Sequence, residues 1–235
     1  MNAKHLRESL RSSADPLIAE HSQRFFKTGK GEYGEGDRFL GIRVPVLRQH
    51  ARQHRNIPIK QLLQLLRSGY HEERLCALLI MVLKYQGGTD EERETIFQHY
   101  LNNTRYINNW DLVDSSAYHI VGVHLENRDR RILHNLARSE SLWERRIAII
   151  STLHFIKKKQ QYEDTLRISR QLLDDTHDLI HKAVGWMLRE VGNRDLSIEQ
   201  AFLHEHYRSM PRTMLRYAIE KFPQKQRKAY LNGRI

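Results

Sequence analysis

Helical periodicity dominates the pattern of hydrophobic and polar residues along this chain. Apolar residues recur every three or four positions, which places them on one face of an α-helix, and no segment alternates convincingly as a β-strand. The pattern predicts helices over residues 3–12, 16–27, 45–55, 58–68, 71–86, 90–102, 109–125, 128–138, 142–158, 161–174, 177–191, 197–208, 211–222 and 224–232.

Several of these helices have recognisable starts. Proline suits the first helical position, because its missing N–H has no partner there. The prolines that fit such a position are Pro16, Pro45, Pro58 and Pro211. A Ser or Thr followed three residues later by Glu has the spacing of a capping box. The pairs with that spacing are Thr89 with Glu92 and Ser141 with Glu144.

Successive pairs of the predicted helices recur roughly every 35 to 40 residues, the length of a two-helix solenoid repeat. The repeats share a pattern but little sequence. We therefore expect an all-α protein with one domain over residues 1–235, a superhelical solenoid of HEAT-like repeats. A compact helical bundle is the alternative arrangement.

A glycine-rich stretch, residues 28–41, interrupts the helical pattern. It contains a GxGxxG match from Gly29 to Gly34, but no strand precedes it and no βαβ unit surrounds it, which argues against a dinucleotide fold. Glu32, Glu35 and Asp37 would also repel a phosphate. An ordered surface loop or a flexible lid fits this stretch better.

Composition narrows the class of partner. The chain has 39 Lys and Arg against 28 Asp and Glu, a net charge of +11, which favours a polyanion such as nucleic acid. The lone Cys76 excludes an intramolecular disulfide and a thiolate zinc cluster. The longest apolar run, residues 77–83, is too short to span a bilayer, and no secretory signal is visible. We expect a cytoplasmic protein.

Two tryptophans fall at helix positions that differ from ordinary core positions. On the helix near 177–191, Trp186 lies with Lys182 and Arg189 opposite the apolar stripe. On the helix near 109–125, Trp110 and Asp114 are one turn apart on the same side. These residues suit a binding surface, whereas the alternatives are a Trp186 packed on a neighbouring repeat and an exposed Asp114.

A third helix supplies a cation within an apolar face. Arg146 falls inside a broad arc of apolar residues near 142–156, with Arg145 at its edge. A guanidinium there is costly unless it meets an anion, so Arg146 would pair with Asp114 or a phosphate, or else extend to water.

Other catalytic classes lack support. His177 and His181 have the spacing of a zinc-binding helix, but aspartate replaces its glutamate and no third ligand follows at a suitable spacing. No nucleophile elbow, nucleotide-binding loop or cysteine pair is present. We therefore expect no metal and no cofactor.

Nearly the whole chain resembles the bacterial AlkD-type DNA alkylation repair glycosylases, which are built from HEAT-like repeats. The segments that carry the resemblance are Phe39–Pro45, Asn109–Asp114, Leu142–Arg146, His181–Glu190 and Pro211–Arg216. The resemblance implies hydrolysis of the N-glycosidic bond of N3- or N7-alkylated purines in double-stranded DNA. It also implies a monomer that needs neither a metal nor a nucleotide cofactor.

The same resemblance assigns roles to residues. Asp114 would be the catalytic carboxylate, Trp110 and Trp186 would flank the deoxyribose, and Arg146 would hold the phosphate backbone. Phe25 and Phe26 stand where the archetypal member has a functional tyrosine, so Phe25 is a candidate DNA contact. Further candidate phosphate contacts on a concave basic face are Arg145, Lys182, Arg189, Arg212 and Arg216.

Two alternatives to a glycosylase stay open. One is a non-catalytic HEAT-like module that binds nucleic acid through the same surface. The other is a protein-interaction scaffold on which the positive charge is incidental.

Overall fold

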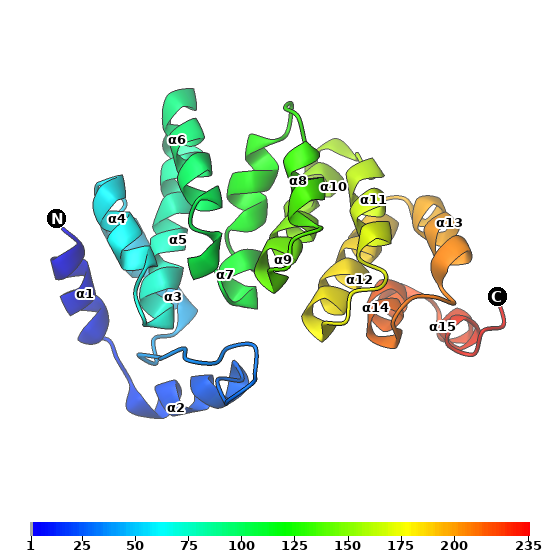
Figure 1. Cartoon of the computed structure of the whole chain (residues 1–235), viewed down its shortest axis with the longest axis horizontal. Helices are drawn as coiled ribbons and strands as arrows, with labels where there is room; N and C mark the ends of the chain where they lie inside the picture. The colour runs from blue at the N-terminus through cyan, green and yellow to red at the C-terminus, as the bar shows by residue number, and fades with distance from the viewer. Residues whose placement is uncertain (1) are drawn as a thin grey trace. The chain divides into compact units, whose positions relative to one another are not determined.

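The computed structural model describes residues 2–235, which form helices joined mostly by short loops, with a longer loop between α2 and α3 (Figure 1). The chain divides into two compact units, one ending at Ser116 and the other running from Ala117 to Ile235. The described residues contain no β-strand, only an isolated bridge between Arg38 and Tyr70. The all-α prediction is therefore confirmed.

The first unit is organised around one buried helix. Its elements are α1 (Ala3–Arg11), α2 (Pro16–Phe25), α3 (Val44–Gln53), α4 (Ile59–Leu66), α5 (His71–Gly87), α6 (Asp90–Leu101), the 3-10 turn η1 (Thr104–Tyr106) and α7 (Trp110–Asp114). α5 packs against α3, α4, α6 and α7, and every residue from His71 to Val82 is buried. Because the helix is covered on all sides, its apolar residues form a continuous run instead of a single stripe.

The second helix and the segment after it differ from the rest of this unit. α2 has no buried residue, and Leu17 and Phe25 are 78% and 57% exposed. The glycine-rich segment returns the chain through tight turns, with Gly31, Gly36 and Gly41 at positive φ. A Cβ on Gly41 would lie 2.0 Å from the carbonyl oxygen of Asp15, so only glycine fits where this segment crosses the start of α2.

The second unit is organised around α12 (Asp178–Gly192), which packs against α9, α10, α11, α13 and α14. The remaining elements are the π-helical turn η2 (Tyr118–Gly122), α8 (Arg131–Leu136), α9 (Leu142–Ser151), α10 (Leu153–Lys159), α11 (Glu163–Gln171), α13 (Leu196–His206), α14 (Arg212–Ala218), the 3-10 turn η3 (Ile219–Lys221) and α15 (Gln224–Leu231). In both units many helices that are neighbours in the chain pack on one another, as in helical-repeat proteins.

Most predicted helix boundaries agree with the structure to within a few residues, and the exceptions have local causes. The helix predicted over 109–125 is wrong: α7 ends at Asp114, where Ser115 and Ser116 donate their hydroxyls to the Leu112 carbonyl and compete with the helical pattern. The helix predicted over 142–158 divides at Thr152, whose hydroxyl donates to the Ile149 carbonyl.

The capping boxes and prolines predicted to start helices agree only partly with the structure. Thr89 and Glu92 form a complete capping box at α6, whereas the Glu144 side chain accepts from Ser139 instead of the Ser141 backbone. Pro58 and Pro211 precede their helices as N-cap residues instead of occupying the first turn. Among residues 2–235, no helix combines the length and hydropathy needed to cross a lipid bilayer.

Candidate functional site

The short helix α7 begins at Trp110, and Asn109 fixes that start. The Asn109 side-chain oxygen accepts a hydrogen bond from the Trp110 backbone N–H at 2.8 Å, as an N-cap does. Asn109 is fully buried, and its amide nitrogen donates to Asp37 at 3.4 Å. Trp110 therefore has a backbone position tied to the glycine-rich segment.

An aromatic cluster in the first unit surrounds Trp110; it comprises Phe25, Phe26, Phe39, His71 and Trp110. The Trp110 ring stacks on Phe26 with centroids 5.3 Å apart, and its edge meets Phe25 at 6.0 Å. Phe26 in turn stacks on Phe39 and contacts His71 at 4.9 Å. Trp110 is half-buried and Phe25 is exposed, so the cluster presents aromatic surface to solvent.

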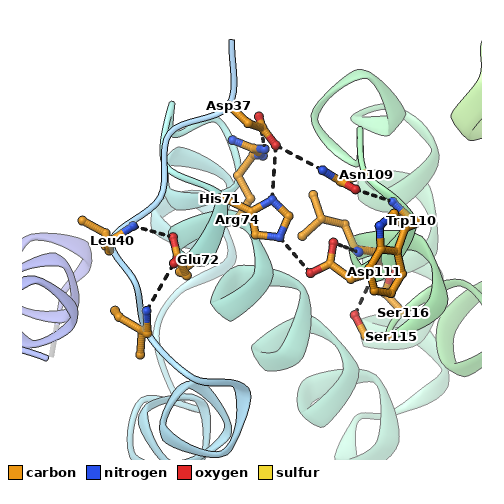
Figure 2. Close-up of polar contacts among 12 residues, drawn as sticks. Asp37, Leu40, His71, Glu72, Arg74, Asn109, Trp110, Asp111, Ser115 and Ser116 are labelled. Carbon is orange, nitrogen blue, oxygen red and sulfur yellow. Dashed lines mark hydrogen bonds and ion pairs between the residues drawn. The ribbon is translucent and has the colours of Figure 1, made fainter. Parts of the chain in front are cut away.

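His71 of the aromatic cluster also belongs to a largely buried charged network formed by Asp37, His71, Arg74 and Asp111 (Figure 2). His71 bridges the two carboxylates, with Nδ1 3.2 Å from Asp37 and Nε2 2.8 Å from Asp111. Arg74 donates to the other oxygen of Asp37 at 2.6 Å. When His71 is protonated, two cations face two carboxylates, and the network satisfies charges that would otherwise be costly to bury.

The electrostatics of the network keep His71 charged. Burial disfavours the imidazolium, but the charge and hydrogen bond of Asp111 and the hydrogen bond of Asp37 outweigh it, raising the pKa of His71 to about 9. The pKa of Asp37 is lowered, because hydrogen bonding to His71 and the charges of Arg74 and His71 outweigh its burial. Asp37 is thus a buried ion-pair partner, which corrects its interpretation as a surface charge that repels phosphate.

Glu72, beside His71 on α5, holds the end of the glycine-rich segment. Its carboxylate accepts backbone N–H groups from Leu40 at 2.8 Å, Gly41 at 2.8 Å and Ile42 at 3.2 Å (Figure 2). The segment 28–41 is anchored at this end, and its Phe39 stacks on Phe26, which in turn stacks on Trp110.

Asp114 is the last residue of α7, one helical turn after Trp110, and it is half-buried. It lies close to Tyr100, whose hydroxyl hydrogen-bonds Ser116 at 2.9 Å. Burial and the charge of Asp114 raise the pKa of Tyr100, with the Ser116 bond acting in the opposite direction. Trp110 and Asp114 thus lie one turn apart as predicted, but on the short helix α7 and not on the longer helix predicted over 109–125.

The two predicted arginines of α9 are held by α12 and by the loop before it. Arg146 is buried and donates to the Leu179 carbonyl in the first turn of α12. Arg145 pairs with Asp175 at 2.6 Å and also donates to the carbonyls of Ser139 and Glu140. The prediction that Arg146 lies within an apolar face is confirmed.

Trp186 lies on α12, as predicted, away from the fully buried stripe that contains Met187. It is half-buried, and its Nε1 donates to Glu190 at 3.2 Å. The predicted cations of this helix already have carboxylate partners: Lys182 pairs with Asp178 at 2.7 Å, and Arg189 pairs with Glu220.

The last two predicted phosphate contacts, Arg212 and Arg216, are exposed on α14. Trp110, Asp114 and Phe25 thus belong to the first unit, and Arg146, Trp186 and the remaining predicted cations to the second. The convergence of these two groups of residues on one concave basic face stays a prediction.

The charged network was missed by sequence reasoning. Asp37 and Arg74 are far apart in the chain, and each looks like an ordinary surface charge in its own segment. One signal was available: His71, Glu72, Glu73 and Arg74 immediately precede the apolar run of α5, on a helix too hydrophobic to have a solvent face. Charged residues at the start of a buried helix require partners from elsewhere in the chain.

His177 and His181, the pair with the spacing of a zinc-binding helix, have structural roles at the start of α12. His177 caps α12 by accepting the Leu179 N–H at 3.1 Å, and His181 bonds to the Asp175 carbonyl. Within residues 2–235, no group of His, Cys, Asp or Glu side chains has an arrangement able to hold a metal ion.

Fold and site together define a class: an all-helical repeat protein with an exposed aromatic cluster next to a partly buried acid. The chain belongs to the DNA alkylation repair enzyme family, whose model matches residues 6–222. Among solved structures it is similar to a predicted DNA alkylation repair enzyme from Enterococcus faecalis, with 17% sequence identity and a TM-score of 0.69. That match covers 90% of this chain and 98% of the other, and it supports the fold. The comparison with curated proteins gave no match.

Proposed function

We propose that this protein is a DNA glycosylase that hydrolyses the N-glycosidic bond of N3- or N7-alkylated purines in double-stranded DNA. One observation carries the proposal: Trp110 and Asp114 lie one turn apart on α7, both half-buried, with Trp110 packed in the aromatic cluster. Membership of the DNA alkylation repair enzyme family supports DNA as the substrate.

Hydrolysis of the bond between C1′ and an alkylated purine needs few catalytic groups from the protein. Alkylation at N3 or N7 gives the purine a positive charge, so the C1′–N bond breaks with its electron pair going to the base, which leaves neutral. The sugar becomes an oxocarbenium-like cation, and the oxygen of a water molecule bonds to C1′. The water loses its proton to the Asp114 carboxylate or to solvent. Asp114 also stabilises the cation electrostatically.

Aromatic and cationic side chains would complete the site. The faces of Trp110 and Trp186 attract the positive charge of the base and sugar, because an aromatic ring is negative above its plane. Phe25 extends the aromatic surface beside Trp110 but has no hydroxyl to offer the lesion. The side chains assigned to contact the phosphate backbone belong to the second unit, and they are Arg146, Arg145, Lys182, Arg189, Arg212 and Arg216.

Substitution of Asp114 by Asn tests the proposal. We expect base release from duplex DNA containing 7-methylguanine to fall by about 10²- to 10⁴-fold, because the acceptor for the water proton is lost. Binding to the same duplex should persist, since the amide is isosteric. Single-turnover release of the free base, measured with a chelator present and no added metal, reports the rate.

Asp90→Asn is the matched control, because that carboxylate is 91% exposed on α6 and should leave release unchanged. An Asp114→Asn protein that releases 7-methylguanine as fast as the parent contradicts the catalytic role. A parent protein that binds duplex DNA without releasing any base would instead be the non-catalytic HEAT-like module.

A further inference from the structure

A groove with a volume of about 670 Å³ lies in the second unit between α8 and α11. One wall comes from α8 and the residues flanking it, and the other comes from α11. α9 packs against both helices. The groove is separate from Trp186 on α12 and from the Arg146 side chain on α9, neither of which lines it.

Both walls are polar along one helix face. The α8 wall presents Arg131, His134 and Asn135, which are spaced i, i+3 and i+4 and therefore share one side of the helix, and Arg138 follows two residues after α8 ends. The α11 wall presents Arg167 and Gln171 at i and i+4. Neighbouring helices of a repeat normally face each other with apolar residues, and Ile132 is the apolar residue in this lining.

The groove has an excess of positive charge. Three arginines line it against one carboxylate, Asp129. Asp129 pairs with Arg131 at 2.5 Å, but both side chains are largely exposed, so the pair contributes little and can open for a ligand. Arg138 is exposed and pairs with no carboxylate of the described residues. Arg167 approaches the exposed Glu163 only at 3.7 Å.

We propose that this groove binds the phosphodiester backbone of a nucleic acid. The planar guanidinium fork matches two phosphate oxygens at once, and the amides of Asn135 and Gln171 offer further donors. Arg131 begins α8 and Arg138 follows its end, so the two guanidinium groups would contact different phosphates of the backbone. None of the described lining residues is Phe, Tyr or Trp, and the imidazole of His134 is held by Asp164 at 3.1 Å, so the groove positions a backbone without stacking bases.

The inference rests on the proposed function only for the choice of nucleic acid as the partner. It does not depend on base excision, because phosphate contacts are the same on damaged and undamaged DNA. The groove would contact the DNA backbone through residues other than those assigned to the lesion.

The test measures binding of the full chain to an undamaged, fluorescein-labelled duplex over a series of salt concentrations. The double variant Arg138→Gln with Arg167→Gln should lower the magnitude of the log–log salt slope by about 2, since each lost phosphate contact removes about 0.9. Arg138→Lys with Arg167→Lys should keep the slope while weakening binding, because the charge stays and the fork is lost.

Lys157→Gln with Lys158→Gln is the matched control. These lysines are exposed in the same unit and lie outside the groove, so the variant loses the same formal charge. Circular dichroism of each variant confirms the helical fold. If the groove variant and the lysine control have the same slope and affinity, the groove does not bind DNA.

Binding of a polyglutamate peptide tests whether the groove binds an acidic protein segment instead of DNA. Peptide binding that the Arg138→Gln, Arg167→Gln variant abolishes, with DNA binding unchanged, would overturn the assignment in favour of an acidic protein segment. Because this duplex is undamaged, the two proposals can fail separately. If the Arg138→Gln, Arg167→Gln variant has the smaller salt slope but the parent protein releases no 7-methylguanine from damaged duplex, the glycosylase proposal is contradicted and the groove proposal is retained.

Discussion

At the scale of single residues, the packing of the second unit depends on a glycine that the sequence does not distinguish. Gly185 lies within α12, where a Cβ would come 2.4 Å from the Met214 carbonyl oxygen and 2.5 Å from Cβ of Tyr217. One of these neighbours is backbone, so it cannot rotate away. Gly185 therefore allows α14 to pack closely against α12, the helix that bears Trp186.

Gly185→Ala should destabilise the protein by about 1 to 3 kcal/mol, the usual cost of overpacking a core. Gly87→Ala is the control, because Gly87 ends α5 and a Cβ added there would meet no neighbouring atom within 4 Å. That substitution should be neutral or slightly stabilising, since alanine loses less conformational entropy in a helix. Urea unfolding compares the two, and equal stabilities would contradict the close approach.

Residue-level prediction succeeded where neighbours in sequence decide the outcome. Thr89 caps α6 through a residue three positions away, and Trp186 lies off the buried stripe of its own helix. Prediction failed for Asp37 in the glycine-rich loop, whose environment depends on Arg74 and His71, residues more than thirty positions away on α5. Helical periodicity carries no information about such distant partners.

At the scale of elements, the charged network joins the glycine-rich loop to α5 and α7. The loop contributes Asp37, α5 contributes His71 and Arg74, and α7 contributes Asp111 (Figure 2). Since Phe26 and Phe39 pack on His71, the network also supports the ring on which Trp110 stacks. The position of the candidate catalytic helix is thus coupled to the charge of one histidine.

This coupling makes stability depend on pH in a definite direction. The pKa of His71 is about 9 in the folded protein against an ordinary value of 6.5, so its contribution is complete below pH 6.5 and is lost as pH rises through 9. The shift corresponds to about 3 kcal/mol. We expect the difference in unfolding free energy between the parent and His71→Gln to shrink by roughly that amount between pH 6 and pH 9.5.

Urea unfolding at several pH values measures this difference, and taking the difference cancels groups that titrate in both proteins. His204→Gln provides the control, because His204 is exposed on α13 and should show no such trend. A parent-minus-variant difference that stays constant from pH 6 to pH 9.5 would show that His71 is not charged in the folded protein.

The elements themselves were predicted with different success. α5 and α12 were predicted almost residue for residue, because long apolar patterns and clear ends define them. The helix over 109–125 was not, since the hydroxyls of Ser115 and Ser116 turn back onto the Leu112 carbonyl. The break ends α7 at Asp114, so this failure of periodicity falls at the candidate catalytic residue.

At the scale of the whole molecule, a net charge of +11 favours association with DNA irrespective of its sequence. If the parent protein contacts about 6 phosphates, the logarithm of its affinity should fall with the logarithm of salt concentration at a slope near −5. Titrations of a labelled duplex at several salt concentrations give this slope. A flat response would favour an uncharged protein surface as the partner and would support the scaffold alternative.

The second helix has a consequence for how the protein can change. Because α2 leaves all of its side chains at least partly accessible, substitutions along it remove little from the hydrophobic core. Its last residue, Phe25, nevertheless touches Trp110. Substitutions on this single helix therefore change the surface beside Trp110 while folding is left intact, so α2 is the place to begin directed evolution of the proposed activity.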